Sequence, residues 1–332
     1  MGRYITRRLI QAAVILVVLS LSVFVLLHVA PGADPAQLRC GLGCTDERLA
    51  AIREDLGLND PLFPVSIDIT DPPIVSFASA SQYGTWIGNL FSGSLGIDFN
   101  GGSVAKQLQN RLPVTGELLL FTFITTVVIG IPFGIISAIS RNSPADYGVR
   151  LGAILGLAVP NFWVATLVIL IPIQLWGYAP PLIGSVSFFD NPWDNLRQFV
   201  PPAIVLGAVS SAGVLRLTRS SMLEVMRQDY VRTARSKGLG EWVVITRHAL
   251  KNSLIPVVTV LGLQLVALLG GAVIIEQVFN LPGIGKYFFE ALFRKDFQVV
   301  QTLTLYIGVV VVLMNLSVDI LYAWLDPRIR YS

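Results

Sequence analysis

Long apolar runs separated by short polar segments dominate the pattern of this chain. About 20 apolar residues span a bilayer as one helix. Six runs come close to that length, at about residues 9–29, 116–139, 149–176, 199–215, 254–278 and 299–321. The pattern therefore predicts six transmembrane helices, with both termini on the same side of the membrane.

The first run is preceded by Arg3, Arg7 and Arg8. A cleaved signal peptide would have a shorter apolar run and a small-residue cleavage site, whereas this run ends in Ala30-Pro31-Gly32. We expect an uncleaved first span, with the arginines holding the N-terminus in the cytoplasm.

The distribution of basic residues indicates the same orientation. Fifteen of the 24 Lys and Arg residues lie in the segments that this topology places inside, which total about 64 residues: 1–8, 140–150, 216–251 and 324–332. The outer segments hold the other nine in about 127 residues. Positive charge is concentrated on the cytoplasmic side of membrane proteins. Both termini are therefore predicted to be cytoplasmic, and the 31–115 loop extracytoplasmic.

Composition agrees with a membrane protein. The chain is 53% apolar and only 14% charged, whereas soluble domains are about one quarter charged. This excludes a soluble enzyme and a disordered chain, and a net charge of +3 is too small to indicate nucleic acid. We expect an all-α integral membrane protein with a first span at 1–30, an outer loop at 31–115, a five-helix core at 116–326 and a tail at 327–332.

The outer loop contains two short helical patterns. Thr45 is positioned to cap a helix that carries Leu49, Ile52 and Leu56 on one face and ends at Gly57. Apolar residues also recur every four positions over 104–112. That segment lies along the membrane surface or, as we favour, packs on neighbouring spans.

Cys40 and Cys44 are the only cysteines and both fall in the outer loop. A nearby pair outside the membrane favours a disulfide, with two free thiols as the alternative. A metal site would need further ligands, and neither His28 nor His248 is near on this topology.

Sequence signatures of catalysis are missing. The chain has no phosphate-binding G-x-x-x-x-G-K-[ST] loop, no H-E-x-x-H zinc motif and no G-x-S-x-G nucleophile motif. Intramembrane proteolysis would need a Ser–His pair or two aspartates within spans, and Asp319 is the only aspartate in a span. We expect no enzyme, no metal site and no bound cofactor in this chain.

Polar and strained positions within the spans are candidates for a translocation path. Polar side chains inside a membrane must face protein or water, and a proline frees a backbone carbonyl. Hydrogen bonds between helices are the favoured alternative for each. Gly130-x-x-x-Gly134 and Gly152-x-x-x-Gly156 are predicted to allow close helix contact. The path candidates are Pro160, Asn161, Gln264, Glu276, Asn315 and Asp319.

The cytoplasmic segment 216–251 is too polar for membrane and too patterned for a spacer. Residues 216–227 read as helical, and a second short helix over 230–237 is predicted to end at Gly238 in a left-handed cap. Such a helix–glycine–helix projection would expose a small basic surface. It is predicted to dock a cytoplasmic partner, with attachment to anionic lipid as the alternative.

This segment carries a family resemblance. Residues 229–239 (DYVRTARSKGL) and 247–256 (RHALKNSLIP) resemble the coupling loop of ABC importer permeases, in particular the B-type subunit of the dipeptide, oligopeptide and nickel branch. The resemblance extends over nearly the whole chain, through motifs at 4–8, 28–32, 56–58, 93–96, 159–162, 270–276, 282–285 and 319–328.

The resemblance implies a six-helix type I importer permease in the inner membrane of a prokaryote. It implies a heterodimeric pathway with a second, C-type permease, two ATP-binding subunits that hold ATP and Mg²⁺, and an extracytoplasmic substrate-binding protein. Peptides are the implied cargo, with oligosaccharides or nickel chelates as alternatives. A secondary transporter is a remote alternative, because no inverted repeat and no acidic residue at a span centre is visible.

The resemblance also assigns ATPase coupling to the projection. Gly238 would set the turn, Ala234 would allow close approach of the ATPase, and Arg235 and Lys237 would meet acidic residues on it. The implied coupling residues are Tyr230, Val231, Arg232, Thr233, Ala234, Arg235, Lys237, Gly238, Leu239 and Trp242.

Two departures from the family pattern accompany these motifs. Arg232-Thr233-Ala234 stands where the family pattern has Glu-Ala-Ala, and Lys251 stands where it has a proline. B-type subunits commonly differ at both places, so these departures point to the subtype. Apart from these two differences in the coupling loop, the segment 63–81 departs from the family pattern and looks like an insertion in the outer loop.

Overall fold

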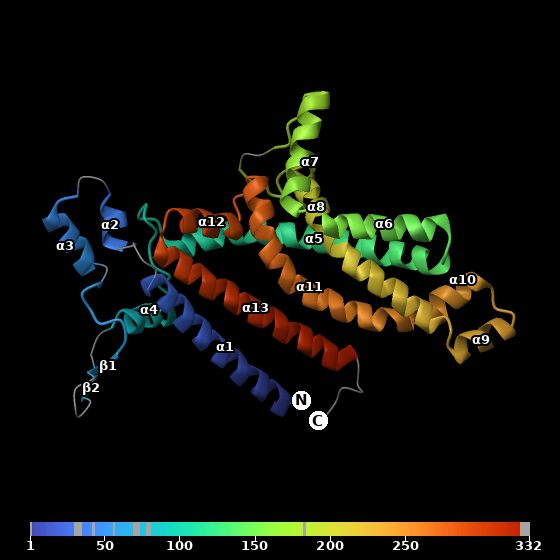
Figure 1. The fold of residues 1–332 in the computed structure, drawn as a ribbon, viewed down its shortest axis with the longest axis horizontal. Helices are drawn as coiled ribbons and strands as arrows, with labels where there is room; N and C mark the ends of the chain where they lie inside the picture. Colours follow the sequence, from blue (N-terminus) through green and yellow to red (C-terminus); the bar gives the residue numbers. More distant parts are fainter. Residues whose placement is uncertain are drawn as a thin grey trace. The chain divides into compact units, whose positions relative to one another are not determined.

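The structure, a computed structural model, is almost entirely helical (Figure 1). It describes residues 2–29, 35–41, 44–55, 57–68, 74–77, 81–181 and 184–325. The chain divides into two compact units. The first comprises residues 1–110 and 288–310, and the second comprises residues 111–287 and 311–332.

The first unit holds the outer-loop elements and the first long helix. Its two short strands pair antiparallel, with Val65 opposite Phe77, and they lie inside the segment predicted as an insertion. The elements wholly inside this unit are α1 (Gly2–Val29), α2 (Pro35–Cys40), α3 (Asp46–Asp55), β1 (Val65–Asp68), β2 (Ile74–Phe77) and α4 (Gln82–Phe91).

The predicted cap of α3 is confirmed. The backbone N–H of Arg48 donates to Thr45 Oγ1 at 3.4 Å, which satisfies one of the free donors at the helix start. Gly57 follows the helix with φ of +63°, a left-handed backbone that favours glycine. Leu56 lies outside the described residues. Cys40 and Cys44 are joined as a disulfide, with Cα atoms 5.6 Å apart.

Aromatic packing holds α1 against α4 within the first unit. Phe24 is buried and stacks on His28, with ring centroids 4.0 Å apart. Tyr83 meets Phe24 edge-on at 5.2 Å and shares a 2.8 Å hydrogen bond with Ser20. The hydroxyl groups of Ser20 and Tyr83 thus form a hydrogen bond with each other, while the Tyr83 ring makes an apolar contact with Phe24.

Three helices run through both units, and the remaining ones belong to the second unit alone. The shared helices are α5 (Val104–Ile139), α12 (Ile284–Phe293) and α13 (Phe297–Leu325). The second unit adds α6 (Pro144–Ala158), α7 (Asn161–Trp176), α8 (Pro192–Val225), α9 (Asp229–Ser236), α10 (Glu241–Val243), the π-helix η1 (Val244–Leu250) and α11 (Lys251–Val278).

The second unit is built around α8, which packs against α11 and closely against α5. An added Cβ on Gly134 of α5 would lie 2.6 Å from Thr218 Cβ and 2.9 Å from the Leu215 carbonyl oxygen. Small residues let helix backbones approach in this way, so the predicted close contact at Gly130 and Gly134 is confirmed. In the second motif Gly152 has open space beside it, whereas an added Cβ on Gly156 would lie 4.0 Å from the Ala208 carbonyl oxygen of α8, so this motif faces α8 through Gly156 and at a greater separation.

Within the described residues, five helices are long and apolar enough to cross a membrane, and α6 with α7 makes a sixth apolar segment. The sequence predicted one span over 149–176, but α6 and α7 are bent by 100° at the break. Val159 is extended, with φ of −94° and ψ of 129°. Proline disfavours helical backbone in the residue before it and lacks an N–H to continue the ladder, which explains the break before Pro160.

The segment 104–112 is also different from the prediction. It is not a separate helix but the first part of α5, which continues through Pro113 and Pro132. Val104 and Leu108 are buried, so at these two positions the segment packs inside the protein, as favoured.

Candidate functional site

The cytoplasmic projection predicted from the sequence forms a compact helical element. Helix α9 begins at Asp229 and ends at Ser236, and Gly238 follows with φ of +78°. The Gly238 N–H donates to the Arg235 carbonyl at 2.9 Å. The short helix and its left-handed cap are therefore confirmed. Helices α8 and α11 lie side by side, and α9 and α10 project beyond their ends (Figure 1).

One face of α9 is fastened to the chain. Val231 and Ala234 are buried, and they pack with Val244 of η1 and Val225 of α8. Burial of such side chains contributes roughly 1.5–3 kcal/mol for each valine. The packing links α9 to both helices at its base.

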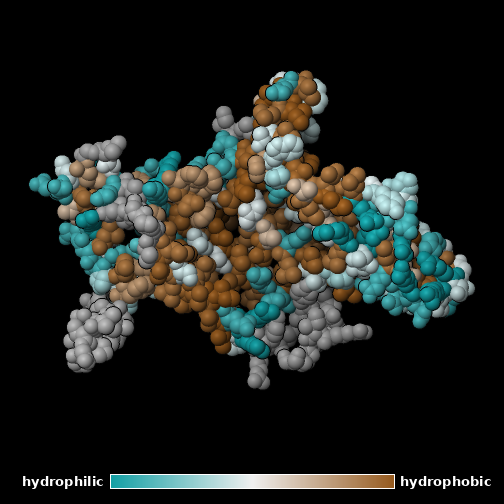
Figure 2. Space-filling view, in the orientation of Figure 1, coloured by the Kyte–Doolittle hydropathy of each residue, from teal (hydrophilic) through white to brown (hydrophobic). Residues whose placement is uncertain are grey.

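The projection also has exposed apolar and aromatic residues at the start of α9, in the following turn and on α10. Tyr230 and Leu239 are exposed, and Trp242 is 72% exposed. Figure 2 shows hydrophilic side chains covering the α9–α10 end of the second unit around them. Exposed Trp and Tyr in a polar surround are typical of the energetically dominant residues of protein interfaces. The surface formed by Tyr230, Leu239 and Trp242 is called the docking surface below.

Charged groups brace the projection. Arg235 Nη2 donates to Glu241 Oε1 at 2.6 Å, and its Nε donates to Oε2 at 3.1 Å. This two-bond pairing raises the pKa of the Arg235 guanidinium above its usual value, so the group is charged at physiological pH. The pair closes the turn between α9 and α10. Arg232 lies 3.6 Å from Asp229 in a highly exposed contact.

Several of the predicted coupling residues make contacts inside the chain. Ala234 packs on Val244, so its small size serves the close approach of α9 to η1. Arg235 is engaged by Glu241. Contacts of these residues with an ATPase remain predictions, as do the roles of Thr233, whose hydroxyl donates to the Asp229 carbonyl, and exposed Lys237.

The base of the projection contains a feature that the sequence did not suggest. Residues 244–250 form a π-helix that continues directly into α11. π-Helical turns are rare and frequent at functional sites. Ile245 and Ala249 of η1 pack with Met222 of α8 and Ala138 of α5, so three helices meet at this base.

The path candidates are distributed over the second unit. Pro160 and Asn161 lie at the break before α7, and Asn315 and Asp319 are partly buried on α13. The Gln264 amide donates to the Ser210 carbonyl of α8 at 2.7 Å. Gln264 and Glu276 are about 18 Å apart along α11 at 1.5 Å per residue, and they have different partners. Their role in a path remains a prediction.

Glu276 is at the centre of a buried hydrogen-bond cluster. Its Oε1 accepts from the Thr115 hydroxyl at 2.6 Å, and its Oε2 accepts from the Lys286 N–H at 2.9 Å. The Thr115 hydroxyl oxygen in turn accepts from the Ile284 N–H at 2.9 Å. The cluster thus ties α5, α11 and the start of α12 together, and donors at a helix N-terminus suit a carboxylate.

Two glycines make room for that carboxylate. A Cβ at Gly283 would collide with the Glu276 carboxylate, and one at Gly285 would lie 2.6 Å from Val273 Cα. Glu276, Gly283 and Gly285 all occur in the resemblance motifs, but Thr115 lies 161 residues from Glu276, and no local pattern joins them.

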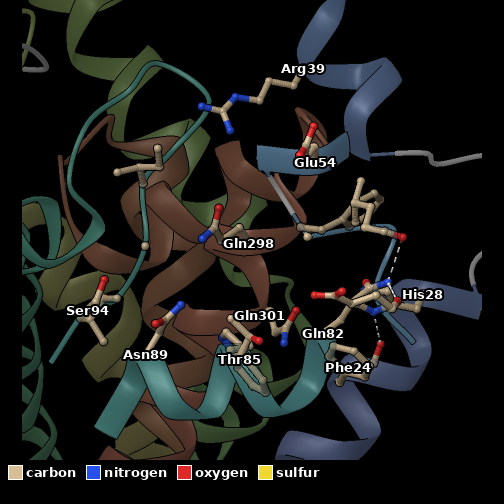
Figure 3. A pocket seen from close by; sticks show the side chains of 18 residues that line it. Phe24, His28, Arg39, Glu54, Gln82, Thr85, Asn89, Ser94, Gln298 and Gln301 are labelled. Atoms are coloured by element: carbon tan, nitrogen blue, oxygen red, sulfur yellow. Dashed lines mark hydrogen bonds between the residues drawn. The ribbon is translucent and has the colours of Figure 1, made fainter. Parts of the chain in front are cut away.

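A cavity of about 380 Å³, lined by both apolar and polar side chains, lies in the first unit (Figure 3). The carboxamides of Asn89, Gln298 and Gln301 lie around it, beside Thr85 and His28. None of the predicted coupling or path residues lines it. Within the described ranges, no three His, Cys, Asp or Glu side chains are grouped to hold a metal ion.

Comparison with known families gives this arrangement its context. Residues 130–331 match the inner membrane component of binding-protein-dependent transport systems, and residues 1–119 match the N-terminal family of the same membrane components. The chain belongs to this inner membrane component family. The resemblance read from the sequence motifs is therefore confirmed.

Relatives of this inner membrane component align over its full length. The dipeptide transport system permease DppB of Alkalihalophilus pseudofirmus is 37% identical over 348 residues, covering 99% of each chain. The oligopeptide transport system permease AppB of Bacillus subtilis is 37% identical over 336 residues, covering 100% of each. DppB of Escherichia coli is 34% identical over 356 residues, again covering 100% of each.

The fold is shared with a solved transporter. A chain of the inward-facing MetNI methionine ABC transporter aligns with a TM-score of 0.54 at 15% identity, covering 66% of this chain and 96% of that one. A second crystal form gives a TM-score of 0.51. The predicted all-α importer permease fold is confirmed.

Proposed function

We propose that this chain is a permease subunit of an ABC importer that brings short peptides into the cell. The observation that carries the proposal is the α9 projection, with its buried attachment and exposed docking surface, in a chain of this family. Full-length relatives named for dipeptide and oligopeptide transport favour peptide cargo over oligosaccharides or nickel chelates.

The proposal includes an orientation in the inner membrane of a prokaryote. The concentration of basic residues at 1–8, 140–150, 216–251 and 324–332 supports cytoplasmic termini and a cytoplasmic projection. The disulfide between Cys40 and Cys44 suits an extracytoplasmic outer loop. The chain is the multi-pass half of a pathway completed by a second, C-type permease.

ATP chemistry belongs to partner subunits in this proposal. Two ATP-binding subunits hold ATP and Mg²⁺, and one of them receives the docking surface. An extracytoplasmic binding protein delivers the peptide. Closure of the ATPase pair moves α9, and the contacts of Val231 and Ala234 with Val244 carry that movement into η1, α11 and α8. This chain supplies positioning and a pathway and makes or breaks no bond.

Substitution at the docking surface tests the proposal in the purified complex with its partner subunits. Trp242→Ala should release the ATPase subunits and abolish ATP hydrolysis stimulated by binding protein and peptide. Trp193→Ala is the matched control, because Trp193 is 62% exposed at the start of α8. Loss of ATPase from both variants, or from neither, would contradict the proposal.

Competition for uptake tests the cargo. In proteoliposomes with the binding protein, unlabelled dipeptides and tripeptides should block uptake of a labelled dipeptide. Oligosaccharides and a nickel chelate should not. Blocking by either of these, without blocking by peptides, would overturn the cargo assignment and leave the permease assignment in place.

A further inference from the structure

A fully buried carboxylate lies beside the base of the projection. Asp146 Oδ1 accepts from Arg219 Nε at 2.9 Å, and Oδ2 accepts from Arg219 Nη2 at 2.9 Å. The Ser137 hydroxyl donates to Oδ1 at 2.5 Å and the Asn142 N–H to Oδ2 at 3.0 Å. Four hydrogen bonds to the carboxylate, two of them from the charged Arg219 guanidinium, fix the position and angle of this group.

Asp146 and its three hydrogen-bond partners come from different segments of the chain. Ser137 lies near the end of α5, Asn142 lies in the turn that follows, and Asp146 lies in the first turn of α6. Arg219 is on α8, ten residues before α9 begins. The cluster therefore fastens the corner between α5 and α6 to the part of α8 that leads into the projection.

A second set of contacts joins this same part of α8 to the projection. Met222, one turn beyond Arg219, packs with Ala138, Ile245 and Ala249. Ser253 donates from its hydroxyl to the Met222 sulfur at 3.0 Å. The end of α8 is thus held by η1 on one side and by Asp146 on the other.

Elsewhere, α6 and α8 meet through apolar side chains. Ala153 and Val149 of α6 pack on Ala212 and Leu215 of α8. Apolar contact is non-directional and packed helices can slide over one another by small steps. A two-bond ion pair sets one register between its partners. The Arg219–Asp146 pair is therefore the contact that prevents α6 from slipping along α8.

We propose that Asp146 and Arg219 form a rigid joint that passes movement of the α9 projection to α6. They are positioning residues for coupled transport, and the inference rests on the proposed function. Without the joint, α9 still docks and the ATPase still turns over, but α6 no longer follows α8.

The ratio of peptide transported to ATP hydrolysed tests the joint in the reconstituted full complex with binding protein. Asp146→Asn removes the charge, and Arg219→Lys keeps the charge but loses the two-bond geometry. Each variant should lower the ratio about fivefold, the size of effect seen for residues that carry coupling between sites. Asp194→Asn, in the exposed ion pair with Arg197 at the start of α8, is the matched control and should leave the ratio unchanged.

A purely structural role has a different signature. It would lower the yield of complex, uptake and ATP hydrolysis together and keep the ratio constant, and that result would overturn the joint. If Asp146→Asn does not assemble, Arg219→Lys alone decides the question by the same ratio. If the unaltered complex shows no hydrolysis stimulated by binding protein and peptide, the proposed function itself fails, and the joint with it.

Discussion

Two arginine–carboxylate pairs in the second unit have nearly the same geometry in different surroundings. Arg219 and Asp146 make bonds of 2.9 and 2.9 Å, and their side chains are 21% and 0% exposed. Arg235 and Glu241 make bonds of 3.1 and 2.6 Å, and their side chains are 37% and 54% exposed. The first pair joins α6 to α8, and the second closes one turn of the projection.

The two pairs differ in whether water can solvate a charged side chain once its ion pair is broken. Breaking a buried pair leaves a charge without solvent and costs about 3–5 kcal/mol. An exposed pair is worth about 0–1 kcal/mol, because water solvates either partner once it is released. The first pair is therefore expected to hold α6 on α8, whereas the second can exchange its partner for water.

The largest expected effect is at the buried pair. Asp146→Ala leaves Arg219, Ser137 and the Asn142 N–H without their common acceptor, and we expect a loss of about 3 kcal/mol of unfolding free energy. The midpoint of denaturant unfolding in detergent measures it. A loss below about 1 kcal/mol would show that solvent reaches the cluster.

A smaller loss of unfolding free energy is expected where an added methyl group disturbs two closely packed helices and no charge is involved. Gly134→Ala places a methyl against Thr218 and the Leu215 carbonyl, and we expect a net loss of about 2 kcal/mol from overpacking. Gly152→Ala is the matched control, because its site is open and alanine favours helix over glycine by about 1 kcal/mol. Equal effects at the two glycines would contradict the close approach of α5 and α8.

The glycine that ends α9 is expected to have a local effect. Gly238→Ala keeps open space around the new methyl but forces alanine into a left-handed backbone, which costs about 1 kcal/mol. Hydrogen exchange of the α9 amides should increase. Gly240→Ala is the matched control, because Gly240 has the same open surroundings without a positive φ. It should leave hydrogen exchange of the α9 amides unchanged. A comparable increase in exchange with Gly240→Ala would contradict a special backbone requirement at Gly238.

The smallest effect is expected at the exposed pair. Glu241→Gln should change the unfolding free energy by less than about 1 kcal/mol. Since salt screens exposed charges with a Debye length of about 3 Å at 1 M, the difference from the unaltered protein should vanish in high salt. If Glu241→Gln lowered the unfolding free energy by more than about 2 kcal/mol and the loss persisted in high salt, this pair would be energetically similar to the buried pair.

Local features were predictable from the sequence, and distant pairings were not. The α9 helix and its Gly238 cap follow from a short helical pattern before a glycine, and the Thr45 cap from a polar residue before α3. The sequence predicts one span over 149–176 and not the 100° bend before Pro160, because a proline alone does not give the bend angle.

The buried clusters are formed by residues far apart in the chain. Arg219 lies 73 residues from Asp146, and Thr115 lies 161 residues from Glu276. One signal was present: Asp146 is the only acidic residue between Glu117 and Asp190, and a lone carboxylate in a predicted cytoplasmic segment with basic neighbours favours an ion pair with an arginine. The sequence does not say which arginine provides it.

We expect the docking surface to meet an ATPase subunit in the cytoplasm. Cross-linking with a short thiol reagent tests it in the assembled complex, with Leu239→Cys as the probe and Phe189→Cys, also exposed, as the control on the segment predicted to face outward. We expect cross-links to an ATPase subunit from Leu239→Cys only. Cross-links from Phe189→Cys, or none from Leu239→Cys in an assembled complex, would contradict it.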